Sequence, residues 1–364
     1  MRRILSALMP VIAASLFLGG CPTDVQAQLV WRVSVKFILN GSGNRPSTGN
    51  CNTDAEVQAQ IDLANQLMDA YGRGYRLQLT EIVDVSGVSQ WFTTTINDAN
   101  RDALELAAVG APATYAWRSN AINIYINGDD GSGICSFPGT GDIIFLGQGI
   151  RTTTFIHEIG HFMDLCHTQG CPCGSCDPNE TGDCHTVPVS DELGDTPPDL
   201  ECWTQNQIAM NFYGIPYASL TSGQQNFVNE SFNNIMSYHN TRNRFTPDQW
   251  DRAICTSNSS RDHVTNGRCF FVGNKSSGSE ECQQSVTYVQ PLFANAVALA
   301  GNGDVINLRG GARPFIGTVT KPLWLLNSRG DAYLGLASAP ADARLDDGPV
   351  VPELPDTDDG RTGP

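Results

Sequence analysis

The segment at residues 152–168, TTTFIHEIGHFMDLCHT, constrains the fold more than any other part of the chain. It holds three of the six histidines in the 364 residues. In a helix, His157 and His161 lie one turn apart, so both imidazoles leave the same face within reach of one metal ion. Glu158 follows His157 directly and can take a proton from water at such an ion without being a ligand itself. The segment therefore predicts a helix that presents a zinc site.

A third imidazole nitrogen is most simply supplied by His167, six residues after His161. Three nitrogen ligands with one open position are typical of catalytic zinc. A straight helix would carry His167 past the ion, so the chain must turn sharply before it. Asp164 stands where the turn is needed, and Asp, like Asn, tolerates the left-handed backbone conformation. The alternative is an amphipathic helix with incidental histidines, and the turn-capable residue at the right offset argues against it.

Residues 157–167, HEIGHFMDLCH, resemble the extended zinc motif of the metzincin metalloproteases, HExxHxxGxxH, with Asp164 in place of the usual Gly. Residues 234–238, NIMSY, resemble the Met-turn of the same family. The resemblance implies that Met236 packs beneath the three imidazoles without binding zinc. It also implies that Tyr238 can swing towards the metal and hydrogen-bond the tetrahedral intermediate. A plain core methionine and a buried structural tyrosine are the alternatives for these two residues.

Two further stretches narrow the resemblance to the pappalysin-like metzincins: GDTP at 194–197, and FTP at 245–247 followed by Gln249. Residues 133–138 resemble the edge strand that precedes the active-site helix in that family, and the whole resemblance covers about 28–269. It implies an α+β fold with an upper twisted sheet backed by helices and an irregular, disulfide-rich lower subdomain. It also implies that protein or peptide substrates pair with the edge strand.

Local patterns agree with an α+β or α/β arrangement. Thr53 and Glu56 form a capping box ahead of apolar residues at helical spacing, which predicts one long helix packed on a sheet. Thr246, Pro247 and Gln249 predict the start of another helix. Alternating or apolar runs predict the strands, which we expect at 30–39, 75–83 and 121–126, followed by an apolar run at 143–146.

The chain is expected to divide into several units. The resemblance places the catalytic domain at 28–272, and a polar stretch at 273–285 has the composition of a linker. Residues 286–335 are β-rich and resemble a coil of a right-handed parallel β-helix. The segment at 336–364 is acidic and rich in proline, which predicts disorder.

The N-terminus predicts export. Residues 1–20 combine a positive start with a short apolar run, and the sequence LGGC ending at Cys21 resembles a lipobox, which would make Cys21 the lipidated residue of a cell-envelope lipoprotein. The alternative is an ordinary signal cut after 25–27, VQA, which gives a secreted protein. Contact with a membrane is expected only through a lipid at Cys21, because no later segment is apolar enough to cross a bilayer.

Composition supports this compartment and excludes some partners. Twelve cysteines indicate an oxidising environment. Disulfides are the preferred interpretation of one cysteine group, and a structural zinc knot is the alternative; the group comprises Cys171, Cys173, Cys176 and Cys184. The net charge of −16 argues against nucleic acid as a partner. Calcium suits the acids of the same region, and relatives carry it, although a solvated acidic loop is the alternative; these acids are Asp177, Glu180, Asp183, Asp191, Asp195 and Asp199.

The sequence thus predicts an exported zinc endopeptidase that hydrolyses peptide bonds with a metal-activated water. Zinc is expected on His157, His161 and His167, with Glu158 as the general base. A thermolysin-like enzyme would take a downstream Glu as its third ligand, and His167 and the Met-turn argue against it. A non-catalytic, surface-displayed binding protein that keeps the zinc fold is the rival from another class. The intact Glu158 argues against that rival.

Overall fold

The computed structural model describes residues 29–70, 74–129, 133–169, 191, 193–199, 203–239, 241–272, 289–290, 292–301, 304–313, 319–321 and 323–334. The predicted signal region, Cys21, the cysteine group at 171–184 and the acidic tail lie outside the described residues. Within the described part, no helix is both long enough and apolar enough to cross a membrane.

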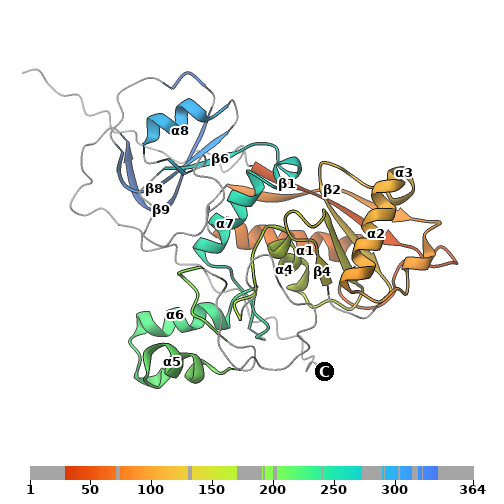
Figure 1. Ribbon diagram of the computed structural model, residues 1–364, viewed down its shortest axis with the longest axis horizontal. Coiled ribbons are helices and arrows are strands. Elements are labelled where there is room, and N and C mark those ends of the chain that lie inside the picture. The colour runs from red at the N-terminus through yellow and green to blue at the C-terminus, as the bar shows by residue number, and fades with distance from the viewer. Residues whose placement is uncertain are drawn as a thin grey trace, which may run out of the picture.

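The first half of the chain forms a five-stranded sheet in the order β2-β1-β3-β5-β4 (Figure 1). Its strands are β1 (Leu29–Ile38), β2 (Tyr75–Val85), β3 (Ile122–Asn127), β4 (Gly133–Cys135) and β5 (Ile143–Gly147). Four strands run parallel, and β4 pairs antiparallel with β5 at one edge. The strands predicted from alternation are therefore confirmed, and β4 is the edge strand that precedes the histidine helix.

Helices cover both faces of this sheet. The helices of the described residues are α1 (Asp54–Ala70), α2 (Asp98–Gly110), α3 (Pro112–Tyr115), α4 (Thr154–Phe162), α5 (Gln205–Tyr213), α6 (Ser222–Phe232), α7 (Pro247–Ser257) and α8 (Phe293–Leu299). Short 3-10 turns are η1 (Ser89–Trp91), η2 (Tyr217–Ser219) and η3 (Asp262–Val264). Helices α1, α4 and α7 share one core with the sheet, and α2 and α3 share a second core on its opposite face.

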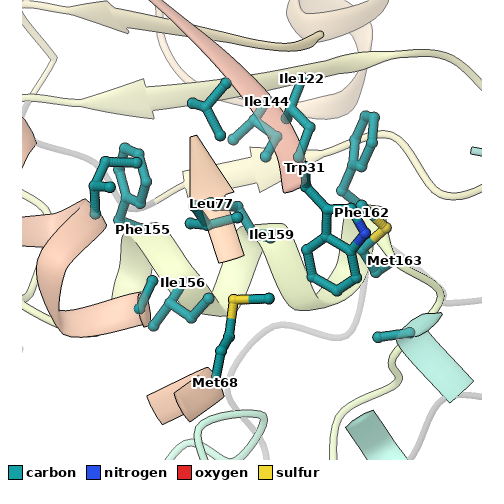
Figure 2. Close-up of a cluster of buried hydrophobic side chains, with 14 of the residues drawn as sticks. Trp31, Met68, Leu77, Ile122, Ile144, Phe155, Ile156, Ile159, Phe162 and Met163 are labelled. Carbon is teal, nitrogen blue, oxygen red and sulfur yellow. The ribbon is translucent and has the colours of Figure 1, made fainter. Parts of the chain in front are cut away.

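The larger core fixes where α4 lies. Phe155, Ile159 and Phe162 of α4 are fully buried against β-strand residues such as Ile122 and Ile144 (Figure 2). Burial of each such side chain contributes roughly 1.5–3 kcal/mol. The helix is therefore held against the sheet along its apolar side, and its position relative to the edge strand is set by the core.

Both capping boxes predicted from the sequence are present. Glu56 N donates to Thr53 Oγ1 over 3.2 Å, and Thr53 N donates back to Glu56 Oε2 over 3.0 Å. Thr246 and Gln249 form the same reciprocal pair at the start of α7. The predicted long helix is present as α1, and a second helix, α2, was not predicted; Asn97 caps α2, and Leu104 and Ala108 are among its buried residues.

A second sheet follows the α7 region, in the order β7-β6-β8-β9. It comprises β6 (Cys269–Val272), β7 (Val289–Gln290), β8 (Val305–Arg313) and β9 (Trp324–Leu334), all in parallel register. Cys269 and Val305 belong to the large core, so this sheet packs on the first unit. Strands β7, β8 and β9 lie within the segment expected to be β-rich, and the helix α8 lies against this sheet (Figure 1).

Candidate active site

Three imidazoles converge at one point beside α4. The Nε2 atoms of His157, His161 and His167 lie 2.8–3.2 Å from one another, and all three residues form one group that could hold a metal ion. His157 and His161 come from α4, whereas His167 returns from beyond its end. The predicted juxtaposition of the three histidines is therefore present. It is the only such group of three or more metal-binding side chains in the described part of the chain.

The hydrogen bonds of these rings show which nitrogen is free. His157 Nδ1 lies 2.7 Å from Ile235 O, and His161 Nδ1 lies 2.6 Å from Leu165 O. A carbonyl only accepts, so each Nδ1 carries the hydrogen and each Nε2 points a lone pair at its neighbour. Lone pairs that face each other at about 3 Å repel, and a cation bound by both nitrogens removes the repulsion. This donor set fits zinc, for which tetrahedral nitrogen ligands about 2.0–2.1 Å from the ion lie roughly 3.3 Å apart.

Burial also favours the neutral, metal-binding form of the three imidazoles. Desolvation lowers the pKa of His161 to about 4 and lowers the pKa of His157 and His167 well below the ordinary value. The imidazoles therefore stay neutral at physiological pH, which is the form that ligates a metal.

The turn that returns His167 is made by Asp164. Its φ is 72°, the left-handed conformation predicted for this position. Asp164 N donates to His161 O over 2.9 Å, and Leu165 N donates to Gly160 O over 2.9 Å, which together form a Schellman motif. The Asp164 carboxylate accepts from Arg252 Nε of α7 at 3.3 Å. The side chain is thus anchored to a helix, and not to nearby backbone as its turn-forming role suggested.

Met236 lies beneath the histidine helix. It is fully buried, and its sulfur occupies the space beside Gly160: a Cβ at residue 160 would lie 2.5 Å from Met236 Sδ. Thr168 N donates to Met236 O over 3.2 Å, which ties this turn to the residue after His167. The predicted packing of Met236 under the ligand segment is present, and it requires glycine between the two helix histidines.

Tyr238 closes one side of the group of imidazoles. Its ring centroid lies 4.5 Å from that of His167 and 6.2 Å from that of His157. The side chain is 44% exposed, so it is not the buried structural tyrosine of the alternative interpretation. An exposed phenol beside the imidazoles can donate to a bound substrate.

Glu158 is buried between α4 and the edge strand. A Cβ at Gly133 of β4 would lie 2.6 Å from Glu158 Cγ, so the absence of a side chain there makes room for the carboxylate. The thiol of Cys135, two residues on, lies within hydrogen-bonding reach of the Glu158 carboxylate. Burial raises the pKa of Glu158 to about 8, which Arg242 and Arg101 oppose. The edge strand therefore positions this carboxylate as well as bordering the site.

One carboxylate joins three segments around the site. Asp199 is fully buried and accepts hydrogen bonds from Ser231 and from Thr168 Oγ1, the latter at 3.4 Å. His239 Nε2 lies 3.1 Å from the same carboxylate. Thr168 follows His167 and His239 follows Tyr238, so Asp199 fixes the positions of both neighbours. Sequence reasoning listed Asp199 only as a calcium ligand, and spacing offered no signal for this role.

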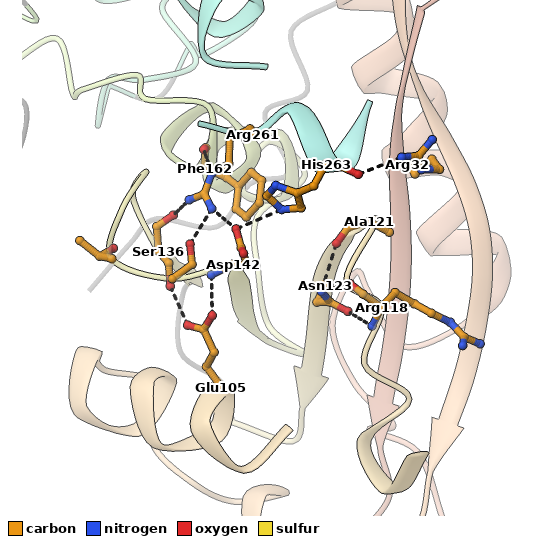
Figure 3. A network of polar contacts seen from close by, with 12 residues as sticks. Arg32, Glu105, Arg118, Ala121, Asn123, Ser136, Asp142, Phe162, Arg261 and His263 are labelled. Carbon is orange, nitrogen blue, oxygen red and sulfur yellow. Dashed lines mark hydrogen bonds and ion pairs between the residues drawn. The ribbon is translucent and has the colours of Figure 1, made fainter. Parts of the chain in front are cut away.

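A second anchor holds the edge strand. Arg261, beyond α7, donates to Asp142, to Ser136 O at 2.8 Å and to Phe162 O at 3.0 Å (Figure 3). Its guanidinium also lies 3.8 Å from the centroid of the Phe162 ring. Ser136 and Asp142 flank the loop between β4 and β5, and Phe162 ends α4. Arg261 therefore fixes the edge strand relative to the histidine helix.

The other predicted site residues fall into two groups. Asp177, Glu180, Asp183 and the cysteines at 171–184 lie outside the described residues. Asp191 accepts from Thr196 and from Gln249 Nε2, and Asp195 accepts from Asp248 N at 2.9 Å. Calcium binding by these acids stays a prediction.

The cysteines that are described differ in state. Cys166 and Cys255 are disulfide-bonded, whereas Cys51 and Cys135 are buried thiols. The general expectation that most cysteines are paired stays a prediction, because the cysteine-rich group is outside the described residues.

Comparison with known proteins finds a family model that is similar to this region. Residues 147–256, which include the three histidines, Glu158, Met236 and Tyr238, match the family model described as pregnancy-associated plasma protein-A. No curated protein matches the chain.

Among solved structures, mirolysin in complex with compound 9 is similar to 65% of this chain and 95% of its own, at 18% identity and a TM-score of 0.43. Mature mirolysin of Tannerella forsythia in complex with a cleaved peptide is similar to 67% of this chain and 96% of its own, at 18% identity and a TM-score of 0.38.

Proposed function

We propose that this chain, a pappalysin-like metzincin metalloprotease in residues 147–256, is an exported zinc endopeptidase that cleaves protein substrates. The observation that carries the proposal is the convergence of three neutral imidazoles beside a buried glutamate on one helix. His157, His161 and His167 would hold the zinc. Bound zinc would supply Lewis acidity towards the scissile carbonyl and would lower the pKa of water at the site.

Glu158 is the general base in this proposal. Burial alone favours its protonated form, whereas a zinc ion held by the imidazoles would favour the carboxylate. The carboxylate takes a proton from the attacking water and later passes it to the nitrogen of the leaving amine. Gly133 and Cys135 restrict where the carboxylate can lie, so the proton acceptor is placed before substrate arrives.

Tyr238 and Met236 have supporting roles. The exposed phenol of Tyr238, beside the ring of His167, is placed to donate a hydrogen bond to the oxyanion of the tetrahedral intermediate. Met236 supports the ligand segment from beneath through its contact at Gly160. Neither side chain needs to touch the zinc.

The substrate is expected to lie along β4. This strand is at the end of the sheet order and is bonded to β5 on one side only, so an extended peptide can add to its other side. Such a peptide would pass directly over Gly133, next to Glu158. This arrangement brings a backbone carbonyl of the peptide to the imidazoles.

Export, lipidation at Cys21, disulfides in the lower subdomain and calcium at its acids complete the proposal, together with a β-helix-like unit at 286–335. The twelve cysteines and the apolar N-terminus support an extracytoplasmic location. Replacing Cys21 by Ser should move the protein from the membrane fraction to the soluble fraction. A mass spectrum of an unmodified chain that starts at Gln28 would refute lipidation.

The activity is tested with purified full-length protein and casein as substrate. We expect cleavage that 1,10-phenanthroline abolishes and added zinc restores, with one zinc per chain by elemental analysis. A zinc-loaded, folded protein that cleaves neither casein nor a random peptide library would contradict the proposal. It would favour the non-catalytic binding protein instead.

A further inference from the structure

Arg242 lies at the edge of the site and has no part in the chemistry proposed above. It follows Tyr238 by four residues, and its Nη1 donates to Ser237 O over 3.3 Å. Ser237 stands between Met236, which packs under Gly160, and Tyr238, whose ring lies 4.5 Å from that of His167. The guanidinium is therefore held next to the peptide unit that carries the tyrosine of the site.

The charge of Arg242 reaches the groups of the site. It lowers the pKa of His157 and His167 and opposes the raised pKa of Glu158. Burial lowers its own pKa to about 10, so the guanidinium is still protonated at neutral pH. The side chain is only partly exposed to solvent.

Other largely buried arginines of the chain have a carboxylate partner. Arg101 pairs with Asp98 at 2.5 Å, Arg244 with Glu230 at 3.0 Å and Arg252 with Asp164 at 3.3 Å. Arg242 has no ion pair within 4.0 Å among the described residues. Glu158 attracts the guanidinium without forming an ion pair with it. A partly buried guanidinium without a counter-ion is unfavourable unless an anion joins it.

A second guanidinium adds to this charge. Arg151, which is exposed and precedes α4 by three residues, lowers the pKa of Arg242 through like-charge repulsion. Two positive groups thus act on each other, one in the loop before α4 and the other in the loop after Met236. An anion that binds between the two guanidinium groups would give Arg242 a counter-ion. It would also offset the repulsion between Arg242 and Arg151.

We propose that Arg242, assisted by Arg151, forms a specificity subsite for an acidic side chain, Asp or Glu, of the peptide substrate close to the scissile bond. The inference rests on the proposed peptidase function and specifies which class of peptide the enzyme prefers. A guanidinium can hold a carboxylate through two parallel hydrogen bonds, which fixes the position of the peptide as well as attracting it. The net charge of −16 does not oppose this binding strongly. At physiological ionic strength charges more than about 8 Å away are largely screened.

The C-terminal carboxylate of a peptide offers the same chemistry from another source. An enzyme that reads the terminus would release short fragments from chain ends, and it would fail on amidated peptides. An endopeptidase subsite for a side chain should be indifferent to amidation. Each peptide of the test is therefore made with a free and with an amidated C-terminus.

The experiment uses the full-length, zinc-loaded protein and a random peptide library, followed by matched fluorogenic peptides. The peptides differ only in Glu, Gln or Lys at the position that the library identifies. We expect kcat/KM for the Glu peptide to exceed that for the Lys peptide by at least about tenfold. Arg242→Glu should reverse the order, Arg242→Gln should abolish the preference and Arg242→Lys should retain part of it. Arg151→Glu, at an exposed residue, should weaken the preference without reversing it.

The ratio of the two kcat/KM values on one enzyme is the readout, so a general loss of activity in a variant does not affect it. Zinc content and thermal melting show which variants are folded. Cleavage of the library with no acidic preference, or a preference that Arg242→Glu and Arg151→Glu both leave unchanged, would overturn the specificity and leave the peptidase intact. Loss of the preference on amidation alone would assign the subsite to the chain terminus and overturn the side-chain role. Absence of any cleavage would overturn the peptidase function and the subsite with it.

Discussion

The sheet and the region that surrounds the imidazoles bury their polar groups in different ways. In the sheet, backbone groups pair along the strands, and the interior consists largely of aliphatic and aromatic side chains such as Val33, Val35 and Ile124. The described residues that surround the imidazoles beyond α4, at 163–169, 193–199 and 233–239, lie outside the helices and the strands of the sheets. Buried carboxylates and a guanidinium, those of Asp191, Asp199 and Arg261, hold separate segments together there.

This difference predicts where the protein is sensitive to change. A core of apolar side chains shares its stability among many contacts, so conservative replacements are tolerated. A segment held by a single carboxylate depends on that carboxylate, because its loss leaves several buried donors without acceptors. We therefore expect single substitutions around the site to have larger effects than comparable ones in the sheet.

The largest effect should come from Glu158→Gln. The amide keeps the shape of the side chain but cannot accept the proton from water, so kcat should fall by at least about 100-fold with zinc still bound. Gly133→Ala keeps the carboxylate but displaces it from the edge strand, and we expect a smaller loss of kcat. Activity near that of the wild type for Glu158→Gln would contradict its role as the base.

Asp199→Ala should have the next largest effect. It removes the acceptor of Thr168, Ser231 and His239, and each unsatisfied buried group costs roughly 1–3 kcal/mol. We expect a lower melting temperature and weaker zinc binding, since His167 precedes Thr168. Asp62→Ala, at an exposed site of α1 behind the sheet, is the control and should change stability by less than about 0.5 kcal/mol. Equal effects of the two substitutions would contradict the expectation that the site is more sensitive to substitution than the sheet.

Gly160→Ala tests the packing beneath the ligands. The added methyl group would meet the buried sulfur of Met236, and overpacking of this kind costs roughly 1–3 kcal/mol. The matched control is Gly223→Ala in α6, where nothing lies within 4 Å of the added atom. Urea unfolding of both variants should show a loss of stability only for the first. A control that is as destabilised as Gly160→Ala would show that the sulfur contact is not the cause.

Asp164 separates backbone conformation from side-chain chemistry. Asp164→Gly should be nearly neutral, since glycine adopts positive φ freely and this offsets the lost contact with Arg252. Asp164→Val should cost about 1–2 kcal/mol more, because a β-branched residue resists positive φ. Zinc titration and denaturation give both values. If Gly is the more damaging replacement, the carboxylate matters more than the turn.

One residue of the sheet is an exception, because it buries a charged side chain in the apolar interior. Lys36 is fully buried in β1 and its Nζ donates to Asn123 Oδ1 over 2.6 Å. Burial lowers the pKa of Lys36 to about 7, below that of the unfolded chain. Above pH 7 the unfolded state therefore binds more protons than the folded state, so stability should rise by about 1 kcal/mol between pH 6 and 8.

Lys36→Met should remove this contribution to the pH dependence, because methionine has no titrating group. Asn123 Oδ1 keeps a hydrogen-bond donor in the variant, Arg118 N at 2.9 Å. The measurement is the free energy of unfolding in urea at pH 6, 7 and 8. An unchanged slope in the variant would show that another group titrates.

The sequence predicted the histidine site well because its chemistry is local. His157, His161 and the turn at Asp164 are fixed by helix geometry and by one left-handed residue, both of which spacing shows. The helices α5 and α6 were not predicted, although each starts with the same Thr-x-x-Gln capping box that identified α7. That signal was present and was missed. The roles of Asp199 and Arg261 could not be predicted, since they depend on contacts between distant segments that no local pattern encodes.

The sequence separation of the Arg261 contacts has a consequence for biosynthesis. Arg261 lies 125 residues after Ser136 and 99 residues after Phe162, yet it joins the loop of the edge strand to the end of the histidine helix. A chain is made from its N-terminus at about 5–20 residues per second, so all three imidazoles are synthesised before this anchor exists. The site therefore cannot reach its final geometry until residue 261 has been synthesised. The proteolytic hazard to the synthesising cell is thereby confined to chains that have been synthesised beyond residue 261.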